Sequence, residues 1–340
     1  MGFAAIRAVA GYLPPQTEKN DMTTRAAQAL GIEERHVASS EQAASDLAVQ
    51  AAEKLFSRHP LARDGIDFVL LCTQQPDYPL PSTACIVAER LGFAKSVGAL
   101  DYSLGCSGYV YGLALAKGLI EAGLSKKLLL LTASLYSRDV SREDRATAPV
   151  FGDGASATLL EAAGGARPLL DAFVFGTDGS GAKSIIREVG GSRFPYGSAP
   201  LENIEDEHGS HTKADLFMDG QEVMLFTLRE VPPMVEEVLA RAGLAREELS
   251  YAVFHQPNKF MLDYVQRKCK LQQVPFFHDV RKTGNTVSAS IPLGLEQIIG
   301  HYEGDLSHVL LAGYGVGLSW AGCMADLSQL YGTHSIIDEE

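Results

Sequence analysis

Short apolar runs alternate along the chain with longer segments in which apolar and polar positions mix. The runs predict buried strands at residues 67–72, 127–132, 252–254 and 309–312. The longer segments predict helices at residues 41–55, 84–91, 107–122, 223–242, 259–269 and 291–302. Three of these helices are followed by a glycine of the kind that ends helices, namely Gly92, Gly123 and Gly243. Strands alternating with helices indicate parallel sheets covered by helices, which is an α/β fold.

Two stretches of the chain repeat one arrangement. One apolar strand ends at Cys72, and another is followed directly by His255. At a similar distance after each strand, a glycine followed by Cys106 or by Asn285 precedes an apolar helix. Self-similarity of this kind indicates a duplicated unit.

The repeat predicts where the chain divides. We expect residues 1–165 to form an N-terminal half that carries Cys106. Residues 166–340 would then form a C-terminal half that carries His255 and Asn285. No linker rich in proline and serine separates them, so we expect the two halves to pack as one body.

Composition limits the class of protein. The chain has 340 residues, of which 46% are hydrophobic and 21% charged, and this excludes a disordered, collagen-like or coiled-coil protein. Its 29 Lys and Arg against 42 Asp and Glu give a net charge of −13, which argues against nucleic acid or an anionic membrane as the main partner. We also find no apolar run long enough to span a membrane. The five scattered cysteines, without a CxxC pair, predict reduced thiols in the cytoplasm.

Motifs for bound cofactors or metals fail on spacing. Residues 176–184 miss the phosphate-loop pattern by one position, and residues 313–317 lack the last glycine of a dinucleotide-binding pattern. The stretch at 177–213, rich in glycine, serine and charge, predicts a long loop. His208 and His211 form an HxxH pair within it, but no third ligand is evident, so we favour a solvated loop over a zinc site.

Cys106 is the leading candidate for a nucleophile. It stands at the predicted start of a helix that is apolar on every face, which indicates burial. The unpaired amides and positive dipole at a helix start favour a thiolate. The glycines on either side, Gly105 and Gly108, allow a substrate or another backbone to approach closely. We therefore expect a reactive thiolate rather than a small buried hydrophobe.

His255 and Asn285 are the candidate partners of Cys106. His255 follows a buried strand, the position from which α/β proteins present reactive side chains. Asn285 adds an uncharged amide donor at the position that the repeat makes equivalent to Cys106. The other histidines in charged or turn-like surroundings are predicted to lie on the surface, namely His36, His59, His301, His308 and His334.

Several motifs together resemble beta-ketoacyl-acyl-carrier-protein synthase III, of the thiolase superfamily. They lie at residues 31–38, 81–85, 104–109, 144–145, 151–155, 218–223, 255–258, 284–286 and 315–317. The resemblance implies a thiolase-like, five-layered αβαβα fold built from two similar halves, and a homodimer. It implies no permanently bound cofactor and no metal, with acyl-CoA or acyl carrier protein and malonyl-ACP as substrates.

The resemblance also implies a two-stage reaction. Cys106 would take an acyl group from a thioester, and malonyl carrier protein would then lose carbon dioxide. His255 and Asn285 would donate hydrogen bonds to the thioester oxygen as enolate charge develops. The backbone amides of Cys106 and Val316 would form the oxyanion hole of the condensation step.

Other positions match the family's substrate contacts. Leu80 stands where the family often has a phenylalanine that reaches into the partner's acyl pocket, which predicts room for a longer or branched primer. Arg145 matches a nucleotide-contacting arginine, and Asn258 is expected beside the thioester, CoA or pantetheine. The tryptophan and arginine that usually clamp the adenine of CoA have no counterpart, since the only tryptophan is Trp320. The sequence therefore does not decide between a carrier-linked and a CoA-linked acyl donor.

A basic group on one helix is the candidate docking site for an acidic carrier protein. It comprises Lys259, Arg267, Lys268 and Lys270. Phe260 and Leu225 stand where the family would place further basic residues. A solvated helix face is the alternative interpretation.

Other functions remain open from the residues themselves. The same fold could pass a Cys-bound acyl group to an alcohol, amine or aromatic acceptor without decarboxylation, or act as a silent scaffold. The order Cys, His, Asn also fits a papain-like protease, although the signature around that cysteine is absent. We favour the condensing enzyme.

Overall fold

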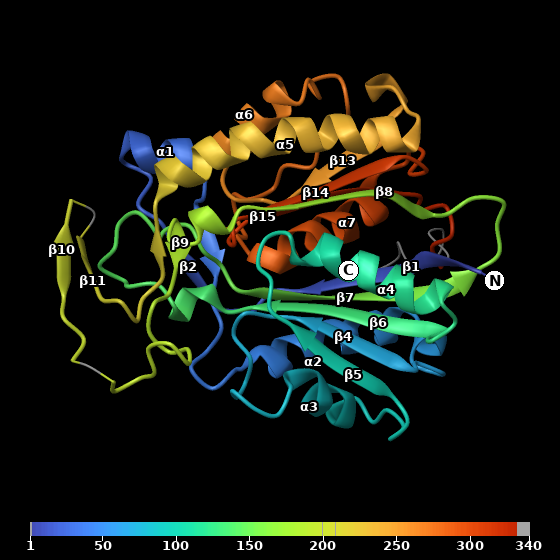
Figure 1. Cartoon of the computed structure of the whole chain (residues 1–340), viewed down its shortest axis with the longest axis horizontal. Coiled ribbons are helices and arrows are strands. Elements are labelled where there is room, and N and C mark those ends of the chain that lie inside the picture. The colour runs from blue at the N-terminus through green and yellow to red at the C-terminus, as the bar shows by residue number, and fades with distance from the viewer. Residues whose placement is uncertain (1, 199, 208, 332–340) are drawn as a thin grey trace.

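The protein has five layers in this computed structural model, which describes residues 2–198, 200–207 and 209–331. Two helices cover the outside of one sheet, two more lie between the sheets, and two cover the second sheet (Figure 1). This confirms the predicted α/β, five-layered αβαβα class. His334 and the acidic C-terminal end lie outside the described residues.

The first sheet has strand order β1-β7-β6-β4-β5. Its strands are β1 (Phe3–Tyr12), β4 (Phe68–Cys72), β5 (Gly98–Tyr102), β6 (Lys127–Ser134) and β7 (Gly154–Ala163). Strand β4 runs parallel to β5 and β6, whereas β7 is antiparallel to β1 and β6.

The second sheet has order β13-β14-β15-β8. Its strands are β8 (Leu170–Thr177), β13 (Tyr251–Phe254), β14 (Val309–Gly315) and β15 (Ser319–Ala325). Only β13 and β14 are parallel. The expectation of parallel sheets therefore holds for only part of each sheet, because β7 and β15 run antiparallel to their neighbours. The short turn from β14 to β15 can only form a hairpin.

Six long helices fill the other layers. Helices α2 (Ala44–Arg58) and α3 (Thr83–Arg90) cover the first sheet; α4 (Gly108–Glu121) and α7 (Ser290–His301) lie between the sheets; α5 (Gly220–Ala242) and α6 (Lys259–Lys268) cover the second. The ends of these helices agree with the predicted ones to within three residues. We expected helix α4 to be buried on every face, but one face is open to solvent, where Leu115 is 44% exposed.

The strands of the two sheets fall on opposite sides of residue 165, with β7 ending at Ala163 and β8 beginning at Leu170. The division at 165/166 stays our prediction. Smaller elements are the helix α1 (Arg25–Leu30), the pair β2 (Thr17–Lys19) and β3 (Glu34–His36), and 3-10 turns at Pro60–Ala62, Tyr136–Arg138, Gly179–Gly181, Arg246–Glu248 and Val287–Ala289.

The predicted loop at 177–213 contains little regular structure. It holds β9 (Ile185–Ile186), which pairs with β12 (Phe217–Met218), and the hairpin of β10 (Ile204–Asp206) and β11 (Gly209–His211), which projects at one end of the molecule (Figure 1).

His211, however, is buried rather than solvated, with Nδ1 3.9 Å from Asp206 Oδ2. Its neighbour His208 lies outside the described residues. Within those described ranges, no three His, Cys, Asp or Glu side chains are grouped as metal ligands, and no helix has the length and apolarity that crossing a membrane demands.

Candidate functional site

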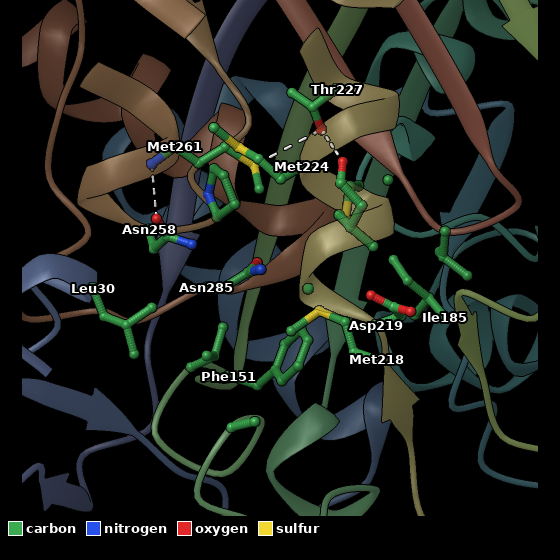
Figure 2. A pocket seen from close by; sticks show the side chains of 18 of the residues that line it. Leu30, Phe151, Ile185, Met218, Asp219, Met224, Thr227, Asn258, Met261 and Asn285 are labelled. Carbon is green, nitrogen blue, oxygen red and sulfur yellow. Dashed lines mark hydrogen bonds between the residues drawn. The ribbon is translucent and has the colours of Figure 1, made fainter. Parts of the chain in front are cut away.

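One cavity of about 710 Å³ collects the reactive side chains. Cys106, His255 and Asn285 all line it, although they come from different elements and from both predicted halves. Much of the remaining wall is apolar, with Leu30, Phe151, Ile185, Met218, Met224 and Met261 (Figure 2). The chamber therefore suits a hydrophobic acyl chain that meets a few polar groups.

Cys106 immediately precedes Ser107, the N-cap of α4. Its segment packs directly on β14. A Cβ atom at Gly315 would lie 2.6 Å from Cys106 Sγ, and one at Gly313 would lie 2.5 Å from the Cys106 carbonyl oxygen. Only glycine at these two positions lets the cysteine approach the strand so closely.

Two backbone amides face the sulfur. The N–H groups of Val316 and of Cys106 itself donate to Sγ and favour its anionic form, so both predicted oxyanion donors lie at the nucleophile. Burial is the larger effect and raises the pKa of Cys106 to about 12. This opposes the expected resting thiolate, because burial raises the pKa more than the two amides lower it and so favours a neutral thiol in the free enzyme.

His255 follows β13 and is only 1% exposed. Its backbone N–H donates to the carbonyl of Ala312 at 2.7 Å, which fixes the residue against β14. Its Nδ1 lies 2.8 Å from Ser290 Oγ, and its ring meets Tyr314 edge to face. Burial lowers the pKa of His255 to about 3, so the imidazole is neutral at physiological pH.

Asn285 is held by its own backbone and by its side-chain oxygen. Its N–H donates to Val150 O at 2.9 Å, and its carbonyl accepts from Gly152 N at 3.0 Å. Its Oδ1 accepts from the backbone N–H of Val287 at 2.9 Å. Since the oxygen is engaged, the Nδ2 amide hydrogens are the part of Asn285 available to a substrate in the cavity (Figure 2).

The predicted substrate contacts fall into two groups. Val316 and Asn258 line the cavity, and Asn258 Oδ1 also caps α6 by accepting from Met261 N at 2.8 Å. Leu80 is 81% exposed and does not line the cavity of its own chain, and Arg145 is exposed beside the cavity wall. The roles of these residues stay predictions.

The predicted docking residues all lie exposed on or just after α6. Lys259 Nζ pairs with Asp263 at 2.5 Å, while Arg267 and Lys268 lie over the ring of Tyr264 at 5.4 and 5.5 Å. Asp263 reduces the positive charge of this face. The four described histidines predicted for the surface, His36, His59, His301 and His308, are all at least partly exposed.

Sequence reasoning missed the support of His255 and Asn285. Ser290 and Val287 hold these side chains, yet Ser290 looks like an ordinary helix-start serine. Val287 has a strained backbone at φ +53°, and a valine in the sequence gives no sign of such a conformation.

Comparison with known proteins settles the family. A model described as 3-oxoacyl-[acyl-carrier-protein (ACP)] synthase III matches residues 100–179, and the model for its C-terminal part matches residues 239–327. The beta-ketoacyl-[acyl-carrier-protein] synthase III of Lactococcus lactis subsp. lactis (strain IL1403) is 33% identical over 338 residues, covering 96% of this chain and 100% of that protein. The chain belongs to the beta-ketoacyl-[acyl-carrier-protein] synthase III family.

Further synthase III proteins agree. That of Caldanaerobacter subterraneus subsp. tengcongensis is 34% identical, with 88% of each chain covered. A crystal structure of a 3-oxoacyl-(acyl-carrier-protein) synthase III superposes with a TM-score of 0.91 at 43% identity, covering 95% of this chain and 99% of that one. The expected family is confirmed, and with it a condensing enzyme, a transferase of fatty acid biosynthesis.

Proposed function

We propose that Cys106 accepts an acyl group from a thioester and then gives it to a malonyl-derived carbanion. In the first stage, Sγ attacks the thioester carbonyl. The new bond is Cys106 S–C, the bond that breaks is the donor's C–S, and the thiol proton leaves with the departing thiol. Because the free thiol is neutral and buried, this path avoids a bare thiolate in an apolar chamber.

The second stage is decarboxylative condensation. The malonyl carboxylate leaves as carbon dioxide, and the electron pair passes to the thioester oxygen as an enolate. Neutral His255 and the amide of Asn285 donate hydrogen bonds to that oxygen, where a carboxylate would repel the charge. The enolate carbon then attacks the acyl group. The N–H groups of Val316 and Cys106 hold the tetrahedral oxyanion until the C–S bond breaks and Cys106 regains a proton from water.

One observation carries this proposal: the three reactive side chains line the same cavity, with the two backbone donors at the sulfur. The large apolar lining and the short Leu80 side chain support a longer or branched primer.

We propose acyl carrier protein as a partner, which would bind the face that bears Lys259, Arg267, Lys268 and Lys270. We also propose a cytoplasmic location, because all five cysteines are free.

Mass spectrometry of the intact protein tests the first stage. After incubation with a panel of acyl-CoA and acyl carrier thioesters, we expect one acyl adduct, which Cys106→Ala abolishes. The preferred donor in the panel separates CoA-linked from carrier-linked primers. An adduct that persists in Cys106→Ala would place the nucleophile elsewhere.

Release of labelled carbon dioxide from malonyl carrier protein tests the second stage. We expect release to depend on His255 and Asn285 and to yield a β-ketoacyl thioester. An acyl adduct without any carbon dioxide release would instead support transfer to an alcohol, amine or aromatic acceptor.

We also propose that two copies form a homodimer. Strand β5 is an edge of the first sheet, and Leu100 on it is 47% exposed. Leu115 on α4 is 44% exposed, and Tyr111 packs on Phe175, itself 45% exposed. An unpaired edge and exposed apolar side chains favour association with a like surface.

Light scattering after gel filtration checks the dimer. We expect Leu115→Glu to shift the protein toward monomer, because it places a charge in the apolar face. Leu61→Glu, at a leucine that is 80% exposed in a different part of the fold, is the matched control. A wild-type protein that elutes as a monomer would overturn this part of the proposal.

A further inference from the structure

A buried hydroxyl lies behind the imidazole of His255. Ser290 is 3% exposed, and its Oγ lies 2.8 Å from His255 Nδ1 and 2.9 Å from the carbonyl oxygen of Val287. The same Oγ accepts a hydrogen bond from the backbone N–H of Gln256 at 3.3 Å. The single hydroxyl proton therefore has two possible acceptors, the ring nitrogen and the carbonyl.

Val287 connects both members of the decarboxylation pair. Its N–H donates to Asn285 Oδ1, and its carbonyl lies within reach of Ser290. Val287 has φ +53°, in the left-handed region that β-branched residues rarely adopt. Strain of this kind persists where the surroundings impose it, and here it aims one peptide group at Asn285 and the other at the Ser290–His255 pair.

Within the described residues, the backbone group that bonds to the His255 ring is the carbonyl of Val287, which accepts a hydrogen bond and cannot donate one. Two positions after His255 the chain has Pro257, which has no N–H. The N–H of Gln256 is already directed to Ser290 Oγ. The Ser290 hydroxyl is thus the proton donor that can reach Nδ1, and the bond it accepts from Gln256 strengthens it as a donor.

We propose that Ser290 is a positioning residue whose hydroxyl donates to Nδ1 of His255 and so keeps the ring proton on Nε2. A neutral imidazole carries one proton, and only a ring with that proton on Nε2 can donate to a thioester oxygen in the cavity. When the hydroxyl turns to Val287 O instead, Nδ1 holds the proton and His255 cannot stabilise the enolate. This inference rests on the proposed decarboxylative function.

Two substitutions test the role of Ser290. We expect Ser290→Ala to lower carbon dioxide release from malonyl carrier protein roughly 10- to 100-fold, the cost of one buried hydrogen bond. Acylation of Cys106 should stay within about twofold of wild type, because Ser290 does not act on the sulfur. Ser290→Thr keeps the hydroxyl and should restore release.

Ser288→Ala is the matched control. Ser288 is buried in the same turn, but its hydroxyl pairs with Ser134 Oγ at 2.9 Å rather than with His255. We expect its carbon dioxide release to stay close to that of wild type. An equal loss in Ser288→Ala and Ser290→Ala would show general damage to the turn and overturn the proposal.

The ¹⁵N resonances of His255 give a readout that a structural role would not change. In protein labelled at its histidines, and assigned by difference from His255→Gln, we expect the proton on Nε2 in wild type and a mixture of the two tautomers in Ser290→Ala. A wild-type ring protonated on Nδ1 would overturn the proposal, as would full carbon dioxide release by Ser290→Ala. Either result would leave Cys106 acylation intact, whereas failure of the proposed function would show in wild type as no adduct or no release.

Discussion

The two walls of the cavity hold their reactive groups in different ways. On one wall, Cys106 is placed by backbone packing against Gly313 and Gly315 and meets two backbone N–H groups. On the other wall, His255 Nδ1 lies in a hydrogen bond with the Ser290 hydroxyl, and Asn285 Oδ1 accepts one from the Val287 N–H. We call the first the nucleophile wall and the second, with His255 and Asn285, the decarboxylation wall. The space left by two glycines sets the position of the sulfur on the nucleophile wall. Hydrogen bonds set the orientation of the side chains on the decarboxylation wall.

The difference follows from what each wall does in the proposed mechanism. The sulfur must approach a carbonyl carbon and then become part of a tetrahedral centre. It therefore needs space for that centre and N–H donors for its oxyanion. The other two groups must point hydrogens at one oxygen, so small rotations are costly. Added volume should therefore damage the first wall most, and altered polarity the second.

The largest effect is expected for Asn285→Asp. The substitution keeps the shape but replaces the amide donor by a carboxylate that repels the enolate, so we expect carbon dioxide release to fall roughly 1000-fold. Acylation of Cys106, measured by intact mass, should persist. Loss of both activities together would contradict the assignment of Asn285 to one wall only.

Gly315→Ala should act on the other wall. Its Cβ would lie 2.6 Å from Cys106 Sγ, so the sulfur must move, and we expect acylation to slow about 100-fold. Gly300→Ala is the control, since a Cβ there would meet nothing within 4 Å. Stopped-flow acylation separates the two, and normal acylation in Gly315→Ala would show that close packing does not place the sulfur.

The pH dependence of unfolding sharpens the comparison further. The pKa of His255 is lowered from 6.5 to about 3. As the pH falls below 6.5, His255 therefore becomes protonated in the unfolded chain but stays neutral in the folded protein. This contribution to stability is full above pH 6.5 and should shrink by roughly 1 kcal/mol between pH 8 and 5.5. His255→Gln should lose that much less in urea unfolding, and equal slopes in both proteins would contradict a buried neutral imidazole.

The smallest effect is expected at the exposed C-terminal end of α6. Reversing Arg267 and Lys268 to Glu should raise the KM for an acidic carrier protein roughly 5- to 10-fold at low salt, because exposed charges act mainly through screened attraction. Acylation by a small thioester should not change. The double reversal Lys95→Glu and Lys126→Glu, at exposed lysines in two turns outside α6, is the control. An equal rise in KM in the control and in the Arg267 and Lys268 reversal would show that the docking site does not lie on α6.

Periodicity located the long helices and four of the strands, but not all of the sheets. Strand β1 was missed because it is rich in alanine, which has little preference for strands, although Ala4, Ala5, Ala8 and Ala10 are all buried. The antiparallel pairs were missed as well, because pairing partners come from distant parts of the chain. The three reactive residues were found because each stands at a strand end or a helix start.

The sequence by itself predicted the α/β class and the long helices, and it singled out Cys106, His255 and Asn285 as candidates, because these predictions depend on local pattern and residue chemistry. Only the tertiary structure decided that Cys106 is a protonated thiol, since burial by distant elements opposes its charge more than the nearby amides favour it. It alone placed Ser290 behind His255 and gave Val287 its unusual backbone. Both depend on contacts between segments far apart in the chain, which local pattern does not encode.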